Sequence, residues 1–279
     1  LSLVLVAAGC SKTTENTTEE VATEVEDATE AVEEDAAEAE DTVEADTAEA
    51  DTAEAEAEAD TENAATAEGV MSYADYVAAA VDTEVCVETY VQAKQAWWED
   101  NGVGQATFYT QNQDGAFFVY NLQEDYDKLV PGTKIKVTGF KSEWSGEVEI
   151  TDATYEIEDT DTFVADAKDV TDLLGKDELI DYQNQFVSFK GMTVEAANDA
   201  GDAFLYKWDG SGTEGDDLYF NVSLDGNTYT FTVESYLCDK DSDVYKAVQN
   251  LKVGDVVDME GFLYWYEGVN PHITSVSVQ

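Results

Sequence analysis

The stretch from Pro131 to Ile150, PGTKIKVTGFKSEWSGEVEI, has the most regular pattern in this sequence. From Lys134 to Gly139, polar side chains alternate with apolar or small ones, which is the period of a strand with one buried face. Ser145-Gly146 is a turn signal, and Val148 and Ile150 resume the alternation after it. The stretch therefore predicts two antiparallel strands joined by a tight turn.

A similar stretch lies near the C-terminus, at residues 251–276, LKVGDVVDMEGFLYWYEGVNPHITSV. Gly139-Phe140 matches Gly261-Phe262, and the Trp-bearing turn that follows is shared. Asp-Gly pairs, a strong hairpin signal, occur upstream in both halves, at Asp114-Gly115 and Asp225-Gly226. We interpret the two halves as an internal repeat, although two unrelated antiparallel sheets would share some of these turn residues.

The order of elements is the same in both halves. Alternating segments predict strands, which begin at Glu84 in the first half and cover 105–111, 116–122, 185–196, 203–208, 218–224 and 228–234. Short helices are expected over 125–129 and 243–251, and a further helix should follow Ser72, which starts a capping-box pattern with Asp75. Each half thus reads as three strands, a short helix and two strands, with 203–208 as an insertion.

That order, with the phrase Gly-x-x-hydrophobic-x-hydrophobic-x-Gly in the fourth strand, resembles the OB-fold, a five-stranded Greek-key barrel. The resemblance implies a mainly β protein with two tandem barrels, over residues 71–158 and 182–279. Residues 159–181 are then a linker with a short helix. OB-folds bind oligonucleotides, oligosaccharides and proteins, so the fold class alone does not select a ligand.

The N-terminal sequence predicts where the protein lies in the cell. An apolar run ends in Ala7-Ala8-Gly9-Cys10, which resembles the lipobox of bacterial lipoproteins. The resemblance implies that residues 1–10 end a signal peptide. It also implies that a lipid on Cys10 anchors the protein to the bacterial cell membrane, outside the cytoplasm. A chance apolar run is the alternative.

Residues 11–70 fit a spacer behind such an anchor. They are mostly Glu, Ala, Thr and Asp, without an aromatic residue, and cannot bury enough apolar surface to offset chain entropy. We expect a disordered, self-repelling acidic tether. It holds 23 acidic residues and one lysine, which leaves 40 acidic residues and 12 lysines, a formal charge of −28, for the remainder.

Charge also limits the function. All 13 basic residues are lysine, and the formal net charge is −50. A local patch for nucleic acid or another anion could be formed by Lys94, Lys134, Lys136 and Lys141. We favour the interpretation that these lysines solvate a strand face, because the whole-molecule charge repels DNA. An exported nucleic-acid-binding protein remains the alternative.

Aromatic residues are the stronger candidates for a ligand site, because in a strand one of each adjacent pair faces outward. Those at predicted turns are Trp98, Trp144, Tyr264, Trp265 and Tyr266. They would suit a glycan, a peptide or a protein partner on the cell surface. The competing interpretation is that they cover the barrel ends or the interface between domains.

Metal and catalytic signals are incomplete. Asp239, Asp241 and Asp243 alternate as Ca²⁺ ligands can, but the glycine and glutamate of a calcium loop are missing, which favours a solvated loop. One histidine and three cysteines offer no imidazole pair and no four-cysteine zinc site. We predict a non-catalytic binding protein without a cofactor, and keep a carboxylate-dependent hydrolase as a less favoured alternative.

Overall fold

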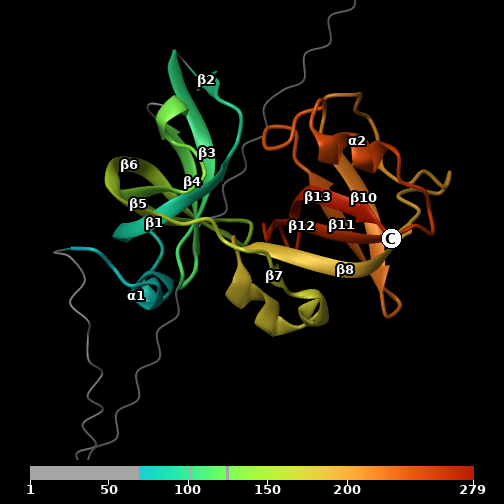
Figure 1. The fold of residues 1–279 in the computed structure, drawn as a ribbon, viewed down its shortest axis with the longest axis horizontal. Coiled ribbons are helices and arrows are strands. Elements are labelled where there is room, and N and C mark those ends of the chain that lie inside the picture. The colour runs from blue at the N-terminus through green and yellow to red at the C-terminus, as the bar shows by residue number, and fades with distance from the viewer. Residues whose placement is uncertain (1–68, 101, 124–125) are drawn as a thin grey trace, which may run out of the picture. The chain divides into compact units, whose positions relative to one another are not determined.

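The structure, a computed structural model, describes residues 69–100, 102–123 and 126–279. Cys10, the rest of the predicted signal-peptide end and the predicted tether as far as residue 68 lie outside these residues. Two closed β-barrels make up most of the described chain, and both belong to one compact unit. The strands and helices of each barrel are shown in Figure 1.

The first barrel is closed by five strands, and a sixth short strand extends it. The strands are β1 (Glu84–Lys94), β2 (Trp98–Asp100), β3 (Val103–Gln111), β4 (Ala116–Gln123), β5 (Thr133–Trp144) and β6 (Glu147–Thr162). Around the barrel the order is β1-β5-β6-β4-β3, and β3 pairs back to β1. Because β4 and β6 run parallel and the other pairs run antiparallel, this is the OB topology.

The second barrel repeats that topology. Its strands are β8 (Phe186–Glu195), β10 (Leu218–Leu224), β11 (Asn227–Val233), β12 (Val256–Phe262) and β13 (His272–Val278). Their order is β8-β12-β13-β11-β10, closed by β8–β10, with β11 parallel to β13. Two additional short strands lie at its edges, β7 (Lys168–Asp169) and β9 (Leu205–Tyr206). The predicted fold class, two OB-like barrels, is confirmed.

The matching glycines have the same role in both barrels. A Cβ on Gly139 would lie 2.7 Å from the carbonyl oxygen of Thr151, and one on Gly261 would lie 2.2 Å from that of His272. Both positions lie where the fourth and fifth strands shift register. The repeat in the sequence therefore marks a close approach of backbones, which only glycine permits.

Helices are few and short, and they close the barrel ends. Ser72 caps α1 (Tyr73–Ala78) by accepting a hydrogen bond from the Asp75 amide, as the capping-box pattern predicts. The helix expected over 243–251 is α2 (Asp243–Gln249), which packs against β10 and β13 (Figure 1). Among the described residues, no helix is long and apolar enough to cross a membrane.

Two expectations need correction. The helix expected over 125–129 is only a 3₁₀ turn, η1 (Tyr126–Lys128), and the strand expected over 203–208 is reduced to β9. The linker contains two 3₁₀ helices, η2 (Thr171–Leu173) and η3 (Asp177–Tyr182), and its β7 joins the second barrel beside β8. Short segments are set by the neighbours they pack on, which local sequence patterns do not report.

Candidate functional site

An OB barrel usually binds its ligand on the outer face of its second and third strands, beside the loops that follow the first and fourth strands. In the first barrel these strands are β3 and β4. The outer side chains of Tyr109, Gln111 and Phe118 are buried there, with Tyr109 fully so. We call these three residues the covered face.

Residues of the second barrel bury the covered face. The ring of Tyr109 stacks on Phe262, with 4.3 Å between centroids and 14° between planes. The Tyr109 hydroxyl lies 2.8 Å from Nδ1 of His272, and the ring of Tyr264 stacks on that imidazole, with 4.3 Å between centroids. Aromatic rings that could stack on a ligand are thus occupied by rings of the same chain.

Polar contacts also join the barrels. Oε1 of Gln111 accepts a hydrogen bond from the Phe186 amide at 2.9 Å. One carboxylate oxygen of Glu147, Oε2, accepts from the Trp265 amide at 2.9 Å and from Nε2 of Gln183 at 3.1 Å. The repeated turns meet as well, since the Glu267 amide donates to the Ser145 carbonyl at 2.7 Å. The Trp265 turn is therefore part of an interface between the barrels.

Burial shifts the ionisation of groups at this interface. It raises the pKa of Glu147 to about 8, against the opposing effect of its hydrogen bonds, and raises the pKa of the neighbouring Glu149 to about 7. It also lowers the pKa of His272 to about 3. At neutral pH the imidazole is therefore uncharged and Glu147 is largely protonated, so these two groups bring little charge into the interface.

The equivalent face of the second barrel is accessible. Leu218, Phe220 and Val222 of β10 point into the barrel core, so the residues between them point outward. The outward positions are Tyr219, Asn221 and Ser223 on β10 and Thr228 and Thr230 on β11, all partly or fully exposed. We call these five residues the open face.

The open face is polar, aromatic and acidic. Oδ1 of Asn221 accepts from the Thr230 hydroxyl at 2.8 Å, and the Ser223 hydroxyl donates to Glu195 at 2.6 Å. Burial raises the pKa of the Tyr219 hydroxyl, and the charges of Asp217 and Glu234 raise it further. Tyr266, which adds to that effect, is 47% exposed on the loop after the fourth strand. Such a surface suits hydrogen-bonding ligands that carry no negative charge.

The five aromatic residues predicted for a ligand site lie in different environments in the structure. Trp144 and Tyr266 are exposed, at 61% and 47%, and Trp98 is half-buried in β2. Tyr264 lies in the interface, and Trp265 packs against the core of the second barrel. Of the set, only Tyr266 borders the open face. The competing interpretation, that aromatic residues fill the interface, is correct for Tyr264 and Trp265.

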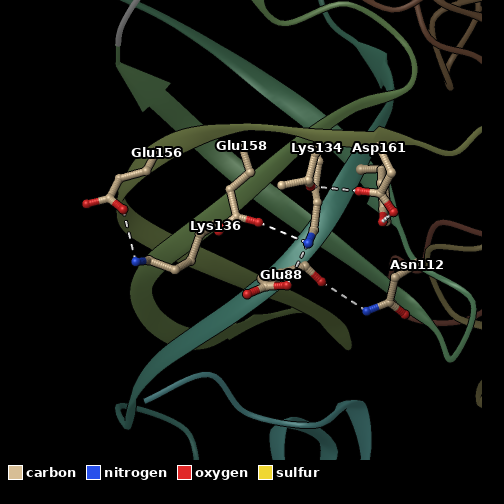
Figure 2. A network of polar contacts seen from close by, with 9 residues as sticks. Glu88, Asn112, Lys134, Lys136, Glu156, Glu158 and Asp161 are labelled. Atoms are coloured by element: carbon tan, nitrogen blue, oxygen red, sulfur yellow. Dashed lines mark hydrogen bonds and ion pairs between the residues drawn. The ribbon is translucent and has the colours of Figure 1, made fainter. Parts of the chain in front are cut away.

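The four predicted anion-binding lysines do not form an uncompensated positive surface. Figure 2 shows Lys134 between Glu88 and Glu158, at 2.9 and 3.0 Å, and Lys136 beside Glu156 at 2.9 Å. Lys141 is buried, and its ammonium donates to the carbonyls of Tyr76, Val77 and Ala79 at the end of α1. Lys94 lies on β1, where burial lowers its pKa. The ammonium groups of Lys134, Lys136 and Lys141 are thus paired with carboxylates or helix carbonyls, which leaves them less available to a phosphate.

The aspartates proposed for Ca²⁺ make local contacts. Oδ1 of Asp239 accepts from the Asp241 amide at 2.9 Å, and Asp241 pairs with Lys240 at 2.9 Å. Asp243 begins α2 behind its cap, Ser242. No group of three acidic, histidine or cysteine residues in the described part of the chain could hold a metal ion, so the structure does not support this site.

The sequence did not identify the open face or the contacts that bury the covered face. Thr228 and Thr230 are ordinary strand residues, and His272 has no motif around it. One usable signal was Phe117-Phe118, since one ring of an adjacent pair must leave the core. Phe117 enters the first core and Phe118 the interface.

Comparison with known proteins finds similar solved structures but no family. No protein-family profile matches this chain, and no curated protein matches it. Solved structures similar to it include a murine DNA-binding protein bound to double-stranded DNA, with TM-score 0.34 and 11% identity over 70% of this chain and 94% of that one. Another is the tetrameric p202 HIN2 domain, with TM-score 0.30 and 12% identity over 71% and 95%. A replication protein A heterotrimer bound to single-stranded DNA has TM-score 0.29 and 13% identity over 69% and 49%.

Proposed function

We propose that this protein is a non-catalytic binding protein whose ligand lies on the open face of the second barrel. The observation that carries the proposal is the asymmetry between equivalent surfaces. The covered face is filled by Phe262, His272 and Tyr264, whereas Tyr219 and Asn221 remain accessible. Of the two OB ligand surfaces, the first is occupied from within the chain.

The chemistry of the open face favours a neutral glycan. Tyr219 and the bordering Tyr266 offer rings on which sugar rings can stack, and Asn221 and Thr230 offer amide and hydroxyl groups. Asp217 adds negative charge beside Tyr219, and Glu234, whose pKa burial raises to about 7, adds part of a charge at neutral pH. Both disfavour a phosphate backbone. A peptide or a protein partner is an alternative outcome of the same experiment.

Nucleic acid is the second candidate. OB-folds bind oligonucleotides on this same face, and similar solved structures are described as bound to DNA. Against it stand the acidic surroundings of Tyr219 and the ion pairs of Lys134 and Lys136. We therefore rank it below a glycan and include it in the test.

The test compares Tyr219→Ala with Tyr120→Ala, a matched control because Tyr120 is an exposed tyrosine of β4. Titration with neutral oligosaccharides should show binding that Tyr219→Ala weakens about tenfold and Tyr120→Ala leaves unchanged. Single-stranded DNA is titrated at low and moderate salt. If DNA alone binds, with affinity that falls steeply with salt, nucleic acid replaces the glycan.

We further propose that a lipid on Cys10 anchors this module outside the cytoplasm. The apolar run that ends in Ala7-Ala8-Gly9-Cys10 and the acidic segment behind it support the proposal. A Cys10→Ser variant should move from the membrane fraction to the soluble fraction. If it stays with the membrane, the lipid assignment is wrong, while the open face is unaffected.

A further inference from the structure

A hollow in the surface lies between the N-terminal helix and the linker, and it shares no residue with the open face. It is an open cavity of about 600 Å³, walled by α1, by the start of β4, by β5 and β6, and by η3 with the residues after it. Its apolar lining comes chiefly from Tyr73, Val77, Ala116, Val148 and Ile180, and we call it the α1 groove. Its volume is within the range of pockets that bind ligands.

Apolar side chains on both walls of this groove are exposed. Val77 of α1 is 56% exposed, and Ala74 and Ala78, which also line the groove, are exposed as well. These three residues stand at i, i+3 and i+4, so they lie on one face of the helix. Ile180 of η3 is 42% exposed. A surface helix normally turns its apolar face to the core, so an apolar face left open beside a groove is a candidate contact surface.

The charges around the α1 groove are mostly negative. The segments 72–82 and 176–182, which include α1 and η3, hold five acidic residues and one lysine. Asp181 lines the groove itself, and its charge adds to burial in raising the pKa of Tyr73 on α1. Lys141 also lines the groove, but it is buried and its ammonium donates to three helix carbonyls, so it has no donor left for an anion. The groove therefore favours a cationic partner over an anionic one.

These charges also bear on which molecule occupies the groove. The chain that precedes α1 has the wrong sign, since residues 11–70 hold 23 acidic residues and one lysine, and the acids of the groove repel them. A second copy would bring a formal net charge of −50. A partner that carries basic residues beside apolar ones meets both requirements, because its apolar side chains can enter the groove while its basic ones face the surrounding acids.

We propose that the α1 groove binds an amphipathic helix of a partner protein, with the apolar face of that helix in the groove and lysine or arginine residues along its edges. Recognition of this kind places apolar residues at i, i+3, i+4 and i+7 of the partner against a hydrophobic groove. Here those residues contact Val77 and Ile180, and the basic edge meets Asp181. The proposal is independent of the glycan proposed for the open face, because the two sites share no residue.

The test uses three fluorescently labelled synthetic peptides, titrated with the full chain and followed by fluorescence anisotropy. The first has leucines at helical spacing and lysines elsewhere, the second has the same composition with its leucines dispersed around the helix, and the third has glutamates in place of the lysines. The first should bind about tenfold more tightly than the second, because only it presents a continuous apolar face, and the third should not bind. Equal affinity for the first two, or no binding of the first, would overturn the proposal.

Two variants separate the apolar contacts from the charged ones. Val77→Ser should weaken binding of the first peptide about tenfold at low and at high salt, whereas Val253→Ser, at an exposed valine of the second barrel, should have no effect. Asp181→Asn should weaken binding about threefold at low salt and less at high salt, whereas Asp199→Asn, in an exposed loop, should not. If Val77→Ser binds as tightly as the unmodified chain, the peptide does not lie in the groove and the proposal fails.

Sedimentation of the chain alone tests the other occupant. The unmodified chain and Val77→Ser should sediment as the same species, since the groove is proposed to bind a different protein. If the unmodified chain self-associates and both Val77→Ser and Ile180→Ser abolish the association, whereas Val253→Ser does not, a second copy occupies the groove and the proposal is wrong. Both groove residues are exposed, so the two variants should keep the melting temperature of the unmodified chain.

Discussion

The two barrels have the same topology, but the equivalent surface is buried in the first barrel and accessible in the second. In the first, Tyr109 and Phe118 turn outward from β3 and β4 and are buried by the second barrel. In the second, Tyr219 and Asn221 turn outward from β10 and remain accessible. The comparison teaches that an OB ligand face can be used as a docking surface within one chain, and that fold alone does not show which barrel binds.

The largest expected effect comes from the centre of the covered face. Tyr109→Ala removes a fully buried ring that stacks on Phe262 and bonds His272, and should lower the free energy of unfolding by about 3–5 kcal/mol. Urea denaturation measures it. Tyr120→Ala, on the exposed part of β4, should change it by less than about 0.5 kcal/mol. Equal effects would show that the barrels do not depend on this contact.

The interface should also make stability depend on pH. The carboxyl of Glu147 has its pKa raised to about 8, whereas an exposed glutamate ionises near 4.5. The unfolded chain therefore gains from ionisation before the folded one, and stability falls as pH rises from about 4.5 to about 8. Glu147→Gln should reduce this slope by about 4 kcal/mol over the window and leave the smaller contribution of Glu149, whose pKa burial raises to about 7.

His272 also makes stability depend on pH, but here stability falls as the pH decreases. Burial holds the pKa of His272 near 3, below its ordinary value of 6.5, so its contribution is present above pH 6.5 and is lost as pH falls toward 3. Denaturation curves recorded from pH 3 to pH 9 should show that Glu147→Gln leaves the loss of stability due to His272 unchanged. If Glu147→Gln also changed how stability depends on pH below 6.5, the ionisation of Glu147 and that of His272 would be coupled.

The repeated glycines offer a smaller effect that compares the barrels directly. Gly261→Ala would place its Cβ 2.2 Å from a backbone oxygen and should cost about 3 kcal/mol. Gly139→Ala meets its nearest atoms at 2.7 Å, one of them the Ile150 methyl, and should cost less. Thermal unfolding of both variants gives the order. The reverse order would show that the first barrel has less room at this bulge.

The smallest expected effect concerns the lysines. Lys134→Gln breaks ion pairs with Glu88 and Glu158 on the first barrel and should reduce stability by at most about 1 kcal/mol, and by less in high salt. Lys136→Gln, whose partner Glu156 is exposed, should have no measurable effect on the melting temperature. A large decrease in melting temperature for Lys136→Gln would mean that Lys136 makes stabilising contacts beyond its ion pair with Glu156.

Much of the architecture was predictable because it depends on neighbours in sequence. The alternation from Lys134 to Gly139 became β5, Ser72 became the cap of α1, and Asp225-Gly226 became the turn between β10 and β11. The candidate site was less predictable. Of the aromatic residues selected from turns, Tyr266 borders the open face, whereas Tyr264 and Trp265 lie inward.

The sequence by itself determined two barrels of one kind, because strand period, turn residues and the repeated glycines are local properties of the chain. Only the tertiary structure decided which barrel keeps an accessible face. That choice depends on Tyr109 meeting Phe262 and His272, residues more than 150 positions away. Such contacts arise from the shapes of two folded surfaces, and the burial they produce also sets the pKa values of Glu147 and His272.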